Sequence, residues 1–140
     1  MADFRYKSGL HSVGQYQMSG VPFATASLTV PALGTAPLEV PFQRITKFIT
    51  VRNIVPTGSA ERTLRVGFSS QGTSGSIPGN QNFFTLANGE SFTGEWRVTK
   101  VFLLCDTANQ SSASVIAGLT TITTGSIPNF NSWSGSVGVG

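Results

Sequence analysis

The sequence predicts an all-β fold, an antiparallel β-sandwich of seven or eight short strands, on three observations. Apolar segments that alternate with polar residues, or are rich in β-branched side chains, recur along the chain. Turn signals made of Gly, Pro, Asn and Ser separate these segments every 8–12 residues or so, the spacing of strands in a sandwich. No segment shows an apolar stripe of helical period, and Gly, Ser and Thr supply 49 of the 140 residues. The pattern is typical of a sandwich or jelly roll, and we expect a single jelly roll, although the strand order does not follow from it.

Four segments of the first half are predicted strands: Ala26–Val30, Leu38–Phe42, Arg44–Ile54 and Thr63–Ser69. The second contains Pro41, which lacks an amide hydrogen and so indicates an edge or bent strand. The third is rich in β-branched residues and is expected to be long. In the fourth, Leu64, Val66 and Phe68 alternate with other residues, which predicts one buried face.

The second half begins with a predicted loop over residues 69–82 and continues with four further strand segments. These are Phe83–Leu86, Ser91–Phe92, Trp96–Cys105 and Ser112–Leu119. Asn88-Gly89 lies between the first two and predicts a β-hairpin, because both turn residues tolerate positive φ. The long apolar stretch that ends at Cys105 predicts a strand covered on both faces at that end.

The domain organisation follows from where the apolar residues gather. We expect an N-terminal arm over residues 1–20, a β-sandwich over residues 21–122 and a C-terminal arm over residues 123–140. The arms bury too little apolar surface to order on their own. Their large side chains are therefore expected to anchor in neighbouring subunits, namely Phe4, Tyr6, Tyr16, Met18, Phe130 and Trp133.

Five basic residues form the one notable charge cluster: Arg44, Lys47, Arg52, Arg62 and Arg65, opposed only by Glu61. They would share a face if segments 44–54 and 63–69 were neighbouring strands. Solvated charges on a sheet, an acidic protein surface and a nucleic-acid backbone are three interpretations. Nucleic acid is disfavoured, since the net charge is only +3 and few aromatic side chains stand nearby for base stacking.

No catalytic or cofactor motif is present in the sequence, which predicts a protein that is not an enzyme and needs no cofactor or metal. One histidine, His11, and one cysteine, Cys105, cannot make a His- or Cys-based metal site. There is no Gly-Lys dipeptide for a P-loop and no G-x-S-x-G nucleophile elbow. The first ten residues have no apolar signal segment and no apolar run is long enough to span a membrane, so we expect synthesis in a cytoplasm, without a secretory signal peptide, and no membrane partner.

Four stretches carry a resemblance to a known group of proteins. They are Gly9 to Phe23 (GLHSVGQYQMSGVPF), Glu61 to Ser69 (ERTLRVGFS), Phe92 to Leu103 (FTGEWRVTKVFL) and Asn131 to Gly140 (NSWSGSVGVG). In texture and order they resemble small virion structural proteins of tailed phages and large double-stranded DNA viruses.

That resemblance implies a jelly-roll capsid decoration (cement), vertex or minor capsid subunit in the virion, made in the host cytoplasm. It implies homo-oligomers, trimers or pentamers, bound to the major capsid protein or other virion proteins. An alternative is a receptor- or carbohydrate-binding fibre or spike head, since jelly rolls also serve lectins.

Overall fold

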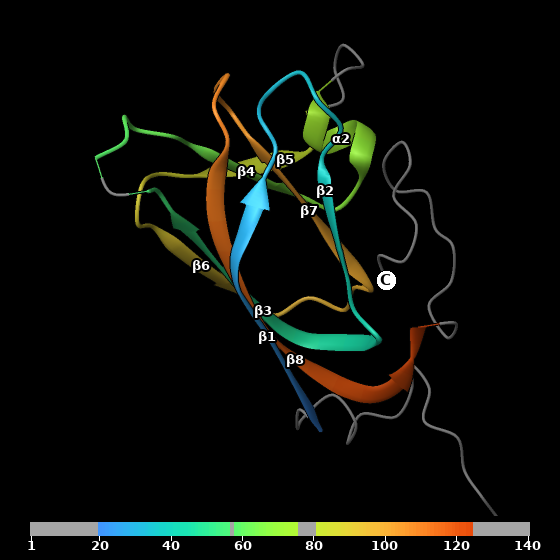
Figure 1. The fold of residues 1–140 in the computed structure, drawn as a ribbon. Coiled ribbons are helices and arrows are strands. Elements are labelled where there is room, and N and C mark those ends of the chain that lie inside the picture. The colour runs from blue at the N-terminus through green and yellow to red at the C-terminus, as the bar shows by residue number, and fades with distance from the viewer. Residues whose placement is uncertain (1–19, 57, 76–80, 125–140) are drawn as a thin grey trace, which may run out of the picture.

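Two antiparallel four-stranded sheets make up the computed structural model, which describes residues 20–56, 58–75 and 81–124 (Figure 1). Sheet A has the order β1 (Val21–Val30), β8 (Ser111–Thr123), β3 (Arg44–Ile54) and β6 (Ser91–Gly94). Sheet B has the order β2 (Leu38–Pro41), β7 (Lys100–Cys105), β4 (Leu64–Gly67) and β5 (Phe83–Leu86). The prediction of an all-β, sandwich-like fold is confirmed.

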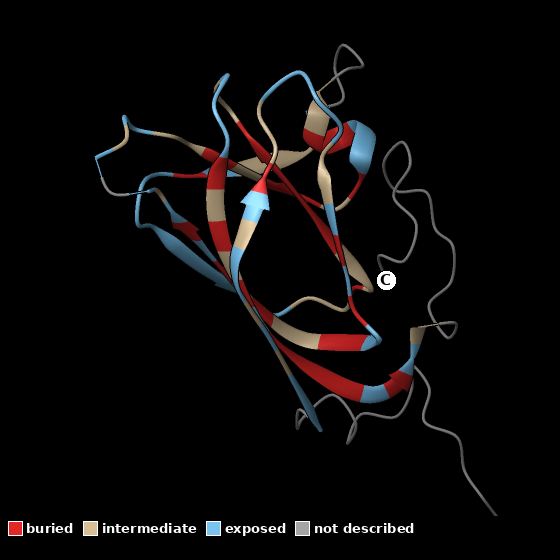
Figure 2. Ribbon diagram, in the orientation of Figure 1, coloured by how far each residue is buried: buried red, intermediate tan, exposed pale blue. Residues whose placement is uncertain are grey.

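The core lies between the two sheets and is built by residues that alternate along the strands. In β3, Ile49, Val51 and Asn53 are buried, whereas the residues between them are half-buried or exposed. Leu64 and Val66 of β4 face them from sheet B and are fully buried. Figure 2 shows the same alternation of buried and exposed residues along β3 and β8.

The two sheet edges formed by β1 and β2 carry features that disrupt further strand pairing. Strand β1 starts at Val21, five residues before the predicted start, and accommodates Pro22 because it is the edge strand of sheet A. A bulge between Thr25 and Leu28 breaks its register, and Ser27 there has φ 57°. In β2, Pro41 lies on the edge of sheet B, as predicted from the sequence.

A short helix, α2 (Ser70–Ser74), occupies the segment predicted to be a loop, so the expectation of no helix was wrong. Ser69 caps it, since its side chain accepts a hydrogen bond from the Gly72 N–H at 3.0 Å. Gly75 ends it in the left-handed conformation, with φ 66°. Ser before and Gly after a short polar segment are the usual helix-capping residues, but five residues are too few to show helical periodicity.

The Asn88-Gly89 turn forms, but the predicted hairpin does not. Strand β5 pairs with β4 in sheet B, and β6 pairs with β3 in sheet A. The turn therefore carries the chain from one sheet to the other, and it is held by backbone hydrogen bonds between Asn53 and both Gly89 and Glu90. A turn signal fixes a local reversal, whereas the pairing partner depends on the long-range contacts of each strand.

The last two strands also differ from their predicted bounds. Strand β7 begins at Lys100 rather than at Trp96, and the segment before it contacts Thr46, whose hydroxyl donates to the Trp96 carbonyl oxygen and accepts from the Val98 N–H. Strand β8 runs to Thr123, into the predicted C-terminal arm. Apart from Gly20, Thr123 and Thr124, both predicted arms lie outside the described residues.

Candidate interaction surface

The outer face of sheet A is a broad, nearly uncharged surface. The strand register places these side chains on it: Pro22, Ala24, Thr29, Phe48, Thr50, Arg52, Ile54, Ser91, Thr93, Ser112, Ser114, Ile116 and Gly118. Arg52 is the one charged residue of this set. Near the middle of β8, Ile116 has 51% of its surface exposed, and Ile54 at the end of β3 has 37%. A face of this composition is typical of a surface that another molecule covers.

The alternation of β3 and β8 explains why this face forms. In β8, Ala113, Val115 and Ala117 point into the core, which leaves Ser114 and Ile116 on the other side of the strand. In β3 the same alternation leaves Thr50 and Arg52 outside. Polar residues on the solvent side of a sandwich are usually Lys, Glu or Asp as well as Ser and Thr, so the scarcity of charge is specific to this sequence.

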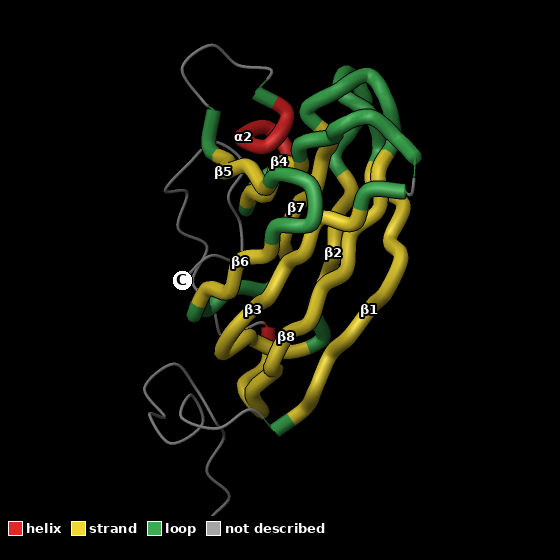
Figure 3. The backbone as a smooth tube through the Cα atoms, turned by 90° about the vertical axis from the view of Figure 1, so that its left-hand side faces the viewer, coloured by secondary structure: helices red, strands yellow, loops and turns green. Residues whose placement is uncertain are grey.

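The outer face of sheet B differs, because the chain itself covers it. Helix α2 packs on β4 and β7, as Figure 3 shows at one end of the sandwich. Leu104 points away from the core between the sheets and is nevertheless fully buried, and Phe102 is 7% exposed. A Cβ atom on Gly67 would overlap Thr73 Oγ1, so the helix lies directly against the sheet. Among the described residues, no helix or strand covers sheet A in this way.

The basic cluster predicted as an interface is divided by the fold. Strands β3 and β4 belong to different sheets, so the condition under which the cluster would share one face is not met. Arg65 bonds Asp106, with 2.7 Å from Nε to Oδ1, and also donates to the carbonyl oxygens of Thr73 and Ser74. Its guanidinium lies 4.3 Å from the centre of the Phe83 ring. Arg65 therefore holds α2 against sheet B.

Arg62 also serves the fold, whereas two of the remaining basic residues are exposed. Arg62 Nη1 donates to the Gln110 carbonyl oxygen, and its backbone N–H donates to Asn88 Oδ1 at 2.8 Å. Lys47 is half-buried. Arg44 and Arg52 are exposed, and neither side chain has an ion-pair or hydrogen-bond partner within residues 20–56, 58–75 and 81–124.

The predicted anchor residues of the two arms, Phe4, Tyr6, Tyr16, Met18, Phe130 and Trp133, lie outside the described residues.

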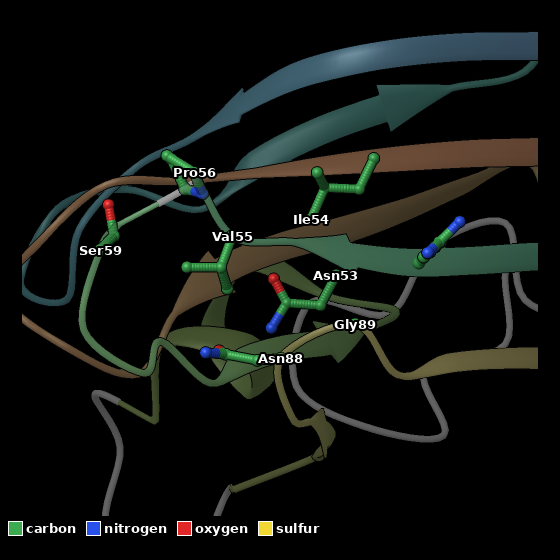
Figure 4. A pocket seen from close by; sticks show the side chains of 8 residues that line it. Asn53, Ile54, Val55, Pro56, Ser59, Asn88 and Gly89 are labelled. Carbon is green, nitrogen blue, oxygen red and sulfur yellow. The ribbon is translucent and has the colours of Figure 1, made fainter.

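A pocket of about 450 Å³ opens where β3 ends, beside the outer face of sheet A (Figure 4). Arg52 and Ser59 line it, and Asn53 and Asn88 come from facing segments. The buried Asn53 amide is fully engaged, since Nδ2 donates to the carbonyl oxygens of residues 62, 86 and 87. Asn53 is therefore a structural residue, and Arg52 supplies the pocket's free charge.

Sequence reasoning missed an aromatic cluster at the β6 edge. Phe92 and Trp96 stack with ring centroids 5.6 Å apart and an interplanar angle of 21°. Phe84 lies 5.2 Å from Phe92, and Phe68 meets Trp96 edge-on at 5.0 Å. Phe92 remains 44% exposed. The signal that could have revealed the cluster is Gly94 between Phe92 and Trp96, because the Trp96 ring occupies the space of a Cβ on residue 94.

Among the reactive and metal-ligating side chains of the described residues, no three His, Cys, Asp or Glu gather as a metal site would require. Burial raises the pKa of the Cys105 thiol, which keeps it protonated and unreactive at neutral pH. No helix in this part of the chain has the length and apolarity needed to cross a membrane.

Comparison with known proteins adds no family to this description. No protein-family model matches the chain, and no curated protein matches it.

Proposed function

We propose that the sandwich is a jelly roll. Its strands pair in a nested series, β1 with β8, β2 with β7, β3 with β6 and β4 with β5. This nested pairing is that of one long antiparallel ribbon folded over on itself. The pairing of β3 with β8 and of β4 with β7 then completes the two sheets. The strand order supports the proposal, because eight strands in two Greek keys define the jelly-roll class.

We propose that the protein is a structural virion subunit, a capsid decoration, vertex or minor capsid protein that binds its neighbours through sheet A. The observation that carries this proposal is the contrast between the two outer faces: among the described residues, α2 packs on sheet B, whereas no helix or strand packs on the nearly uncharged outer face of sheet A. Such a subunit works by adding contact area between its neighbours and needs no reacting group.

The composition of the open face suits repeated contacts. Ser and Thr hydroxyl groups can donate and accept hydrogen bonds, and removing them from water costs less than removing Lys or Glu. Ile116 in the middle of β8 and Ile54 at the end of β3 supply exposed apolar area on the face. A standard interface buries about 800 Å² on each partner, which is the scale of one face of a four-stranded sheet.

The aromatic residues of both terminal segments and the exposed Arg44 complete the proposed contacts. Phe4, Tyr6, Tyr16, Met18, Phe130 and Trp133 would reach neighbouring subunits, either the major capsid protein or other copies of this chain. Arg62 and Arg65 would contribute indirectly, through the fold they hold together.

The test is cosedimentation with capsid shells assembled from the major capsid protein of the same genome. The full chain is expected to pellet with the shells, and Ile116→Lys is expected to lower that binding at least tenfold because it buries an unpaired charge. Thr85→Lys is the matched control, since Thr85 is exposed on β5 in sheet B and should not matter. No binding by the unchanged chain, or equal loss with both variants, would refute the proposal.

A carbohydrate- or receptor-binding head is the second candidate, and the Phe92–Trp96 stack favours it. Aromatic faces stack on sugar rings, and Asn88 and Arg52 beside the nearby pocket could bond hydroxyl or carboxylate groups. Binding of the isolated protein to a glycan array, lost with Phe92→Ala and kept with Ile116→Lys, would favour this function over the capsid contact.

A further inference from the structure

Strand β6 is an open edge of sheet A. It is last in the strand order, and Ser91, Phe92 and Thr93 are all exposed. The ribbon of β6 is mostly in the colour of exposed residues in Figure 2. The other edge of this sheet carries Pro22 and the bulge at Ser27, two features that prevent a further strand from pairing. Strand β6 has no proline, no bulge and no charged residue within its bounds. Within the part of the chain that the structure describes, no strand pairs with β6 on this side, which leaves the edge available for pairing.

The alternation of hydrogen bonds between β3 and β6 determines which backbone groups of β6 point away from β3 and are open to a further strand. The Asn53 N–H donates to the Glu90 oxygen at 3.0 Å, and hydrogen-bonded and non-bonded pairs alternate along an antiparallel ladder. Phe92 and Gly94 are therefore the β6 residues whose backbone groups bond β3. The N–H and C=O groups of Ser91 and Thr93 point away from β3, toward the open side.

Two unpaired charges stand at opposite ends of this edge. Arg52 of β3 is the cross-strand neighbour of Ser91, on the outer face of sheet A. Glu95 directly follows β6, and the alternation of Ser91 and Thr93, carried one residue further, would place its side chain on the same outer face. Both residues are exposed, and neither side chain has a partner in the part of the chain that the structure describes.

We propose that two copies of this chain pair through β6, antiparallel, about a two-fold axis at Thr93. In this register Thr93 faces Thr93 of the second copy, and Ser91 faces Glu95 of the second copy. The paired residues Ser91 and Thr93 are those whose backbone N–H and C=O groups point away from β3. The two β6 strands can therefore form backbone hydrogen bonds with each other. The result is an eight-stranded sheet whose two outer faces lie on the same side.

The same register pairs the free charges. One row across the three strands contains Arg52 and Ser91 of one copy and then Glu95 of the second copy. Arg52 and that Glu95 are therefore two strand spacings apart, about 10 Å between Cα atoms. Extended Arg and Glu side chains span this distance across the small Ser91. Two-fold symmetry makes the ion pair twice, and this self-complementarity favours a second copy over an unrelated strand.

Phe92 gains cover from the same contact. It faces Gly94 of the second copy on the core side of the joined sheet, where the Trp96 ring already lies over Gly94. The exposed Phe92 ring therefore packs beside that Trp96. A shift of the register by two residues would separate Arg52 from Glu95, so charge and packing select the same alignment.

Disulfide trapping tests the register. The Cα atoms of a hydrogen-bonded antiparallel pair lie about 5.5 Å apart, within the range of a disulfide. Thr93→Cys is expected to form a covalent dimer with oxidised glutathione, which takes up the two electrons and two protons of the thiols. Thr85→Cys, on the exposed edge strand β5, is the matched control and should stay monomeric on a non-reducing gel. Equal crosslinking of both variants, or none with Thr93→Cys, would overturn the proposal.

Charge reversal tests the ion pairs independently. In sedimentation equilibrium the unchanged chain is expected to dimerise, and Arg52→Glu or Glu95→Arg is expected to weaken the dimer at least tenfold. The double variant with both changes should restore it. Arg44→Glu, at the other end of β3, should leave the dimer unchanged. A monomer at all concentrations, or no rescue by the double variant, would contradict β6 pairing, whatever the outcome of the shell-binding experiment.

Discussion

Arg65 on β4 donates a hydrogen bond from Nε to Asp106 Oδ1 at 2.7 Å, just beyond the end of β7. The same guanidinium reaches the carbonyl oxygens of Thr73 and Ser74, so one side chain joins two strands of sheet B to α2. Only 14% of the Arg65 side chain is exposed. The packing of α2 on the outer face of sheet B therefore depends on the hydrogen bonds of Arg65.

Arg65→Ala is expected to lower the free energy of unfolding by about 2–4 kcal/mol, because it removes charge-assisted hydrogen bonds and packing on Phe83. Urea denaturation measures the change. Arg44→Ala is the control: an exposed arginine without a partner among the described residues should change stability by no more than about 0.5 kcal/mol. Equal effects of the two variants would show that Arg65 does not hold the helix.

Gly67→Ala is expected to destabilise the fold by about 1–3 kcal/mol, since the added methyl group would overlap Thr73 Oγ1 and lie 2.9 Å from the Asn82 carbonyl oxygen. Thermal unfolding measures it. Gly20→Ala serves for comparison, because its new methyl group would meet only the Thr121 side chain, at 3.3 Å. A Gly67→Ala protein as stable as the unchanged chain would mean that α2 does not pack against the sheet.

Asn53→Ala is expected to cost about 2–4 kcal/mol, because three carbonyl oxygens lose the Nδ2 donor, and the buried one at Leu86 has no water to replace it. Asn88→Ala removes a single exposed acceptor, that of the Arg62 N–H, and should cost about 1 kcal/mol or less. Chemical denaturation of both variants checks the order, and a reversed order would contradict the structural role of Asn53.

The buried Cys105 thiol has a pKa raised by desolvation, with a backbone hydrogen bond and Arg62 opposing the shift. An acid whose folded-state pKa is raised contributes stability that is complete below the unfolded pKa and is lost as pH rises through the folded pKa. Stability should therefore fall above about pH 8.5, and less so in Cys105→Ala. Ellman's reagent at pH 8 should label the thiol only after unfolding, and prompt labelling of the native protein would contradict its burial.

The all-β class and most strands could be predicted because alternation is a local property of the sequence. Strand β4 is an example, with buried Leu64 and Val66 on either side of Arg65. Sheet membership could not be predicted in this way. Segments 44–54 and 63–69 are close in sequence, yet they lie in opposite sheets because β3 pairs with β8, nearly seventy residues away.

The candidate surface was predictable only in part. Alternation in β3 assigns Arg52 to an outer face, but its cross-strand neighbours Ser114 and Ser91 come from β8 and β6 and meet it only in the folded sheet. Arg65 shows the opposite case. Its position in a basic cluster indicated an interface, whereas the fold brings Asp106 and α2 against it.

A cryo-electron microscopy map of intact particles from the source of this gene tests the central claim most directly, namely that the outer face of sheet A is a contact surface. The expected result is this chain in the shell, with Ile54 and Ile116 buried against a neighbouring subunit. The claim is contradicted if the particles lack the chain, or if they contain it with that face turned to solvent.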